Sequence, residues 1–164
     1  MDVEAIFDAH YQVLFRYLVR LTGDPDLAAD VAQESFIRLV ERHPDERQIR
    51  GWLFRVATNL VRDASRVSRR RIELLQESTD VLSLIGAQPD PETMLELKQQ
   101  RQVVRTALEA LSQRDRTLLL MREEGFSHRE MAVAVGTTTK SVGSMIARAL
   151  NKLAAELSRP EIDL

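Results

Sequence analysis

The residues of this chain that could carry chemistry are cations and small hydrogen-bonding groups, and one set of them recurs near the C-terminus. Lys140, Ser144 and Arg148 are spaced by four residues, and Ser141 lies beside them. At roughly 100° per residue, this spacing places them on one face of a helix. The face contains no acid, and Lys and Arg on such a face pair with the phosphates and guanine acceptors of a DNA major groove. The pattern predicts a DNA-binding helix, with a solvated outer face of a helical hairpin as the alternative.

A tight turn must hold this helix against the one before it. Ser127 and Glu130 form an S-x-x-E capping box, which begins a first helix, and Gly136 ends that helix because glycine adopts a left-handed conformation without steric cost. Thr137 or Thr138 is expected to cap the second helix through its hydroxyl. We expect one apolar face on the second helix, formed by Val142, Met145, Ile146, Ala149, Leu150 and Leu153. The arrangement is typical of a helix-turn-helix.

A second set of cations lies at the end of a long helix expected from about Arg47 to Arg71. Five arginines fall within ten residues: Arg62, Arg66, Arg69, Arg70 and Arg71. Three of them share a face by their spacing of four, with Asn59 beside it. The helix macrodipole accounts for one or two cations at a helix C-terminus, at roughly 0.3–1 kcal/mol each, but not for five. We interpret the cluster as a nucleic-acid contact, with a solvated or acid-paired helix end as the alternative.

No arrangement in the sequence is typical of an enzyme. The three histidines, His10, His43 and His128, are scattered without metal-binding spacing, and there is no glycine-rich phosphate loop or G-x-S-x-G elbow. The absence of cysteine excludes disulfides and thiolate metal sites and suits a reducing cytoplasm. No apolar run approaches the roughly 20 residues of a membrane span. We expect no catalytic activity, no cofactor, no metal site and no membrane insertion.

Composition and charge predict an all-α chain of two small domains. With 6 Gly, 5 Pro and 5% aromatic residues in 164, helices are favoured over sheets. The net charge of −2 is unevenly distributed: residues 1–72 hold 12 Arg against 11 acids, residues 73–100 one Lys against six acids, and residues 101–157 nine bases against six acids. We therefore expect a helical bundle at 1–72, a flexible acidic linker at 73–95, a helix-turn-helix domain at 96–157 and a tail at 158–164.

Local signals divide the first block into three helices. Thr22-Gly23 breaks the first helix, Asp24 caps the second with Pro25 at its first position, and a loop follows Arg42. In the second block, a helix is expected from about Pro91 to Leu111, and Ser112 is expected to cap the next one.

Two separate stretches of the chain, in the order in which the family has them, resemble bacterial sigma factors of the extracytoplasmic function (ECF) class. DPDLAADVAQESFIRLVER with IRGWLFRVATNLVRDASRVSRRR is similar to conserved region 2 of that family, and ALEALSQRDRTLLLMREEGFSHREMAVAVGTTTKSVGSMIARALNKL is similar to region 4. The resemblance covers most of the chain. It implies a cytoplasmic factor that binds core RNA polymerase and directs promoter-specific initiation of a stress or envelope-response regulon, with an anti-sigma factor as a further partner.

The resemblance also implies roles for individual residues. The D-x-x-Q-E at Asp30, Gln33 and Glu34 matches the surface that docks on core polymerase, with Phe36, Ile37 and Leu39 expected to pack locally. The residues expected to contact the minus-ten element are Asn59, Arg62, Arg66, Arg69 and Arg70. Those expected to read the minus-35 element are Thr138, Thr139, Lys140, Ser141, Ser144 and Arg148.

The sequence departs from the family in the helix that matches the minus-35 reader. Gly143 and Met145 stand where the family often has basic residues, and Lys140 stands where it often has glycine. This pattern favours a shift of the DNA contacts along the helix.

Two other functions remain open at this point. One is a stand-alone helix-turn-helix regulator with an N-terminal helical interaction domain. The other is a helical adaptor that binds only proteins and pairs its arginine cluster with an acidic partner. Co-purification with polymerase separates the sigma factor from the regulator, and salt-dependent DNA binding separates both from the adaptor. The acidic linker further suggests that the free protein is compact, with linker acids masking its basic surfaces.

Overall fold

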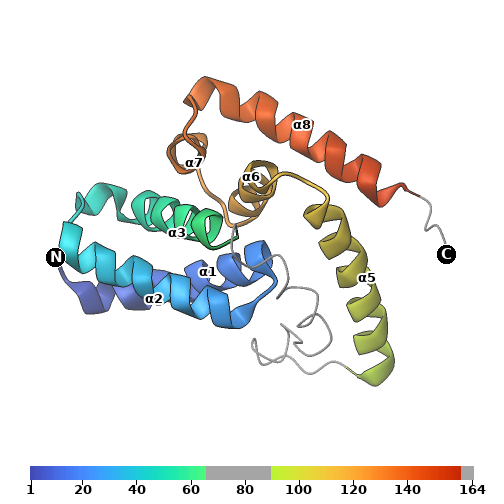
Figure 1. The fold of residues 1–164 in the computed structure, drawn as a ribbon, viewed down its shortest axis with the longest axis horizontal. Helices are drawn as coiled ribbons and strands as arrows, with labels where there is room; N and C mark the ends of the chain where they lie inside the picture. Colours follow the sequence, from blue (N-terminus) through green and yellow to red (C-terminus); the bar gives the residue numbers. More distant parts are fainter. Residues whose placement is uncertain (66–89, 160–164) are drawn as a thin grey trace.

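The computed structural model describes residues 1–65 and 90–159, and within these ranges it contains seven α-helices, one short 3-10 helix and no strand (Figure 1). The all-α prediction is confirmed. Arg66, Arg69, Arg70 and Arg71, most of the predicted linker and the end of the predicted tail lie outside the described residues.

The N-terminal block consists of α1 (Val3–Thr22), α2 (Pro25–Arg42), the 3-10 helix η1 (Glu46–Gln48) and α3 (Ile49–Ser65). As predicted, the Asp24 carboxylate caps α2 by accepting hydrogen bonds from the backbone of Asp26 at 3.0 Å and Leu27 at 3.2 Å. Gly23 ends α1 with a φ of 68°, which glycine adopts without strain. The three long helices bury a shared core that includes Leu14, Leu18, Leu39, Leu53 and Phe54.

The C-terminal block consists of α5 (Pro91–Glu109), α6 (Gln113–Glu123), α7 (His128–Val135) and α8 (Thr139–Leu157). Helix α5 therefore begins within the range predicted for the linker, and the predicted domain boundaries stay predictions. The Ser127 and Glu130 capping box is present, with both reciprocal hydrogen bonds formed. Gly136 ends α7 with a φ of 70°, and α8 follows after a short turn. The helix-turn-helix geometry thus arises where its local signals place it.

Three local expectations are wrong. Thr138 stands at the cap of α8, but its hydroxyl pairs with the Ser141 hydroxyl at 2.8 Å and makes no hydrogen bond to the backbone of the helix. Leu150 is 38% exposed, because it lies about 100° beyond the buried Ala149 on the helix surface. Ile37 is 46% exposed, because its position on α2 faces away from the core that buries Phe36 and Leu39.

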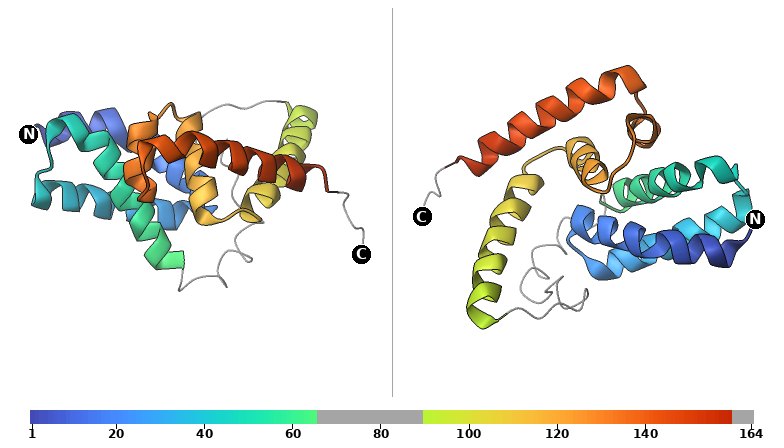
Figure 2. Two further views of the ribbon diagram at one scale, coloured as in Figure 1. Left: turned by 90° about the horizontal axis from the view of Figure 1, so that it is seen from above. Right: turned by 180° about the vertical axis from the view of Figure 1, so that it is seen from behind.

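The two blocks pack against each other. Helix α3 lies against α7 and α1 lies against α6, whereas α5 extends away from the N-terminal block and contacts α8 (Figures 1 and 2). The buried apolar residues of both blocks form one continuous cluster. Tyr17 lies at this junction, fully buried, and its hydroxyl hydrogen-bonds to Thr58 at 2.9 Å; burial raises the pKa of Tyr17 to about 12.

Candidate nucleic-acid and polymerase interfaces

The predicted DNA-reading face of α8 is accessible. The exposed members are Thr138, Thr139, Lys140, Ser144 and Arg148, whereas Ser141 is half-buried and its hydroxyl pairs with that of Thr138. The opposite face of the helix packs into the core through Val142, Met145, Ile146 and Ala149. The core thus fixes the rotation of α8 and directs its polar groups outward.

Gly143 lies on this exposed face, and a Cβ atom built on it would meet only the His128 ring, at 3.7 Å. This is ordinary van der Waals contact, so Gly143 is not required by packing. The Gly143→Ala variant is expected to raise the free energy of unfolding by roughly 0.5–1 kcal/mol, because alanine loses less backbone entropy in a helix. The midpoint of thermal unfolding, followed by circular dichroism, should rise by a few degrees.

Gly136→Ala is the matched control for that measurement. Gly136 also has free space around it, but its φ of 70° strains any residue with a Cβ. The control should therefore lower the midpoint, and equal shifts in both variants would contradict the assignment of Gly143 as an ordinary helical position.

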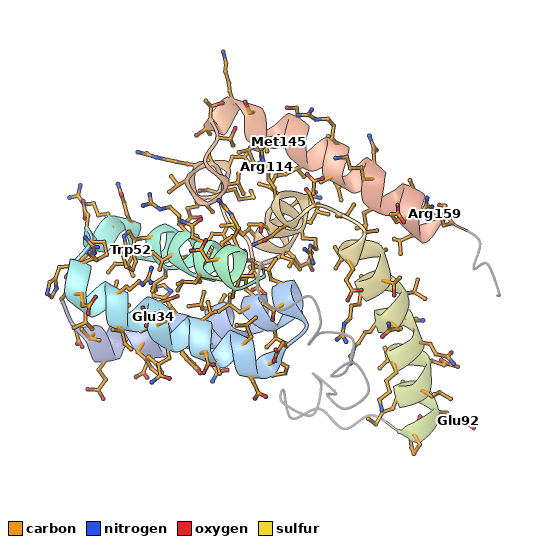
Figure 3. All side chains as sticks on the ribbon, viewed as in Figure 1. Glu34, Trp52, Glu92, Arg114, Met145 and Arg159 are labelled. Carbon is orange, nitrogen blue, oxygen red and sulfur yellow. The ribbon has the colours of Figure 1, made fainter. Side chains whose placement is uncertain are left out.

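A cation that the sequence analysis did not identify adjoins the α8 face. Arg114, the second residue of α6, directs its Nη2 to the Met145 Sδ at 3.3 Å, and the two side chains lie next to each other between α6 and α8 (Figure 3). They line a recess with Arg148 and Lys152, whose Nζ pairs with the Asp115 carboxylate at 3.0 Å. The guanidinium of Arg114 thus covers Met145, one of the positions at which the sequence lacks the basic residue that the resemblance leads us to expect.

The position of Arg114 in the sequence indicates that its side chain has a partner outside α6. The positive end of the helix macrodipole is at the N-terminus, so a cation in the first turn is unfavourable unless something else holds it there.

The predicted minus-ten residues are only partly within the described chain. Asn59 and Arg62 are exposed on α3. Arg62 also lines a recess between the two blocks, together with Arg114 and Gln113 from α6. The structure therefore brings a cation of the N-terminal block near a cation of the C-terminal block. The other three predicted residues, Arg66, Arg69 and Arg70, lie outside the described residues.

The predicted polymerase-binding residues share one exposed side of α2. Asp30 and Gln33 are exposed, and Glu34 forms an exposed ion pair with Arg38 at 2.9 Å. Figure 3 shows Glu34 on α2, well away from Arg114 and Met145. Two exposed aliphatic side chains, Ile37 and Val40, at 46% and 44%, extend the same side of the helix. Acids beside exposed aliphatic groups are typical of a surface that binds another protein.

Both blocks match models of one family. The sigma-70 region 2 model matches residues 6–71, and the sigma-70 region 4 model matches residues 101–153. The ECF sigma factor EcfG of Rhodopseudomonas palustris is 30% identical over 145 residues, which cover 86% of this chain and 77% of EcfG. The chain belongs to the ECF class of the sigma-70 family. The family resemblance that the sequence motifs indicated is confirmed, and we refer below to the two blocks as the region 2 and region 4 domains.

Other proteins match this chain over a shorter stretch or at a lower sequence identity. SigL of Mycobacterium tuberculosis is 43% identical over 74 residues, and this match covers 42% of the chain and 41% of SigL. Among solved structures, the sigma factor RpoE of Bartonella quintana in complex with the anti-sigma factor NepR has a TM-score of 0.69 at 20% identity, over 99% of both chains. CnrH in complex with the cytosolic domain of CnrY has a TM-score of 0.68 at 24% identity, over 94% of this chain and 86% of CnrH. The fold likeness therefore includes both domains.

Within residues 1–65 and 90–159, no helix is long and apolar enough to cross a membrane. In the same ranges, no group of three or more His, Asp or Glu side chains could hold a metal ion.

Proposed function

We propose that this chain is a sigma factor that binds core RNA polymerase and directs promoter-specific transcription initiation in the bacterial cytoplasm. The observation that carries the proposal is the presence of both sigma-70 domains in one chain, in which Asn59 and Arg62 of region 2 and Lys140, Ser144 and Arg148 of region 4 are exposed. The alternative, a stand-alone helix-turn-helix regulator, needs only some N-terminal helical interaction domain, so the match of this domain to sigma-70 region 2 favours the sigma factor. The role involves no covalent chemistry, in line with a transcription regulator and not an enzyme.

The site residues divide among three contacts in this proposal. Asp30, Gln33 and Glu34 bind core polymerase, with Ile37 and Val40 extending the contact. The minus-ten set is Asn59, Arg62, Arg66, Arg69 and Arg70. The minus-35 set is Thr138, Thr139, Lys140, Ser141, Ser144 and Arg148, to which the geometry of α6 adds Arg114. We further propose an anti-sigma factor as a regulatory partner, because the structurally similar RpoE was solved in complex with the anti-sigma factor NepR.

Run-off transcription with purified core polymerase on a library of genomic fragments tests the function. We expect transcripts from a small set of fragments that share two elements at fixed spacing, and none from core polymerase alone. DNA binding by the chain without any dependence on polymerase would instead support the stand-alone regulator.

A further inference from the structure

A recess between the region 2 and region 4 domains is lined by two arginines. Arg62 comes from the last turn of α3, and Arg114 comes from the first turn of α6. The recess has a volume of about 190 Å³, and its remaining lining residues are Thr58, Gln113, Thr117 and Val135. Within the described part of the chain, no acidic residue lines it. Both guanidiniums therefore attract an anion that enters this space, without a carboxylate in the lining to compete for them.

The beginning of α6 adds hydrogen-bond donors to the recess. Gln113 and Arg114 are the first two residues of the helix, so their backbone N–H groups have no acceptor within it. The Ser112 hydroxyl accepts a hydrogen bond from the third N–H group, that of Asp115, at 3.1 Å. The N–H groups of the first two positions, together with the positive end of the macrodipole, favour the binding of a phosphate or a similar anion.

A buried hydroxyl in the lining lacks a hydrogen-bond partner among the described residues. Thr117 is 1% exposed, and its Oγ1 makes no hydrogen bond. Burial raises the pKa of Tyr17, and the nearby Thr58 and Thr117 hydroxyls oppose that rise, but the Thr117 hydroxyl is not positioned to hydrogen-bond with Tyr17. A buried polar group without a partner indicates a water or an ion beside it. A water would satisfy the hydroxyl alone, whereas an anion would also compensate the charge of the two guanidiniums.

Contacts that lie outside the recess hold its two walls in place. Glu124, the C-cap of α6, accepts hydrogen bonds from Arg16 at 2.9 and 2.7 Å, and its carboxylate lies 3.4 Å from the Nη1 of Arg20. On the side of α3, the hydroxyls of Tyr17 and Thr58 hydrogen-bond to each other at 2.9 Å. The donors in the lining are therefore fixed before a ligand arrives, which lowers the entropic cost of binding one.

We propose that this recess binds a small phosphorylated anion that carries one or two phosphate groups. The Arg62 and Arg114 guanidiniums pair with its oxygens, and the first N–H groups of α6 and the Thr117 hydroxyl donate the remaining hydrogen bonds. A volume of about 190 Å³ equals that of roughly six liquid water molecules at about 30 Å³ each, which accommodates a phosphate or a diphosphate. The site goes beyond the proposed function, since neither DNA nor polymerase takes part in it.

Isothermal titration calorimetry of the full chain with inorganic phosphate and with pyrophosphate tests the site, at an ionic strength matched with sodium chloride. Arg62→Ala with Arg114→Ala is expected to weaken the binding of both anions by at least about tenfold, because hydrogen bonds from charged donors are lost. The matched control, Lys98→Ala with Arg122→Ala, removes two exposed cations elsewhere in the region 4 domain and should leave the affinity unchanged. Equal affinities of the two double variants, or no binding of either anion to the wild type, would overturn the proposal.

Substitutions of Thr117 separate ligand binding from packing. Thr117→Val retains the volume of the side chain and removes the hydroxyl, whereas Thr117→Ser retains the hydroxyl. Because this hydroxyl has no partner in the described structure, Thr117→Val should leave the midpoint of thermal unfolding without phosphate unchanged or higher. It should nevertheless weaken the binding of phosphate several-fold, and Thr117→Ser should not. Equal affinities of Thr117→Val and the wild type would contradict the assigned site.

A backbone phosphate of DNA offers the same chemistry, and both arginines also belong to the proposed DNA-contact sets. The same titrations with a short DNA duplex in place of the anion distinguish the two sources. We expect Thr117→Val to leave duplex binding unchanged, because a hydroxyl in the floor of a recess is reached by a free ion and not by a phosphate held in a duplex backbone. Loss of duplex binding in Thr117→Val, with no binding of either free anion, would overturn the small-anion site. Failure of run-off transcription would contradict only the proposed function, since no polymerase enters these titrations.

Discussion

Charge reversal of Asp30 and Glu34 to Lys is expected to weaken the binding of core RNA polymerase by about 100-fold or more. Both residues lie on the exposed side of α2, so an interface there would place two new cations against the partner groups that pair with acids. Like charges across an interface cost several kcal/mol, and about 1.4 kcal/mol corresponds to a factor of ten. The fold should persist, since the only ion pair lost from the described contacts of these residues is the exposed one between Glu34 and Arg38, worth about 0–1 kcal/mol.

The matched control is Glu4→Lys with Asp8→Lys on α1. These residues are also exposed, have the same spacing of four and undergo the same change in charge. Affinity for core polymerase can be measured by fluorescence anisotropy, with helix content checked by circular dichroism. Equal losses in the two double variants would indicate a general charge effect and contradict a specific docking surface on α2.

The elements of the fold were predictable where local chemistry determines them. Asp24 with Pro25, Ser127 with Glu130, and Gly136 each satisfy or terminate a helix end within a few residues, and the structure confirms all three. The wrong expectations concern positions at which a local rule leaves more than one outcome. The Thr138 hydroxyl had a side-chain partner as well as a backbone partner, and periodicity alone did not define the edge of the apolar faces at Leu150 and Ile37.

The contacts that the sequence analysis missed are non-local. Arg16 and Glu124 are separated by 108 positions, and no spacing rule connects them. Both missed charges nevertheless lie at the end of α6 where the macrodipole disfavours them: Arg114 is in the first turn, and Glu124 is the C-cap that follows the last turn. Each is accounted for by groups outside that helix, Arg114 by Met145 and the α8 face, and Glu124 by the region 2 arginines. A charge opposed to its own helix dipole is therefore a sequence signal for a partner elsewhere.

Replacement of Arg114 and Arg148 by Ala together is expected to weaken binding to minus-35 duplex by roughly 30–100-fold at about 0.1 M salt. The two guanidiniums border one recess between α6 and α8, and we expect each to contact one backbone phosphate of the minus-35 duplex. Log affinity falls with log salt, and each phosphate contact adds about 0.9 to the steepness of that fall. The double variant should therefore show a dependence that is less steep by about 1.8. The measurement is a salt titration of the polymerase complex on a promoter recovered by run-off transcription.

Two further variants test whether the loss of affinity comes from the contacts of Arg114 and Arg148. Lys98→Ala with Arg122→Ala removes two exposed cations elsewhere in the region 4 domain and should leave the slope unchanged. Adding Met145→Arg to Arg114→Ala should restore the contact, because it returns a cation to the position that Arg114 covers and at which the family often has one. Since Met145 is only 6% exposed, an arginine there would need to extend its guanidinium toward the space that Arg114 vacates. If affinity and slope stay at the Arg114→Ala values, Arg114 does not substitute for the family's basic residue, and its role would be limited to packing α6 against α8.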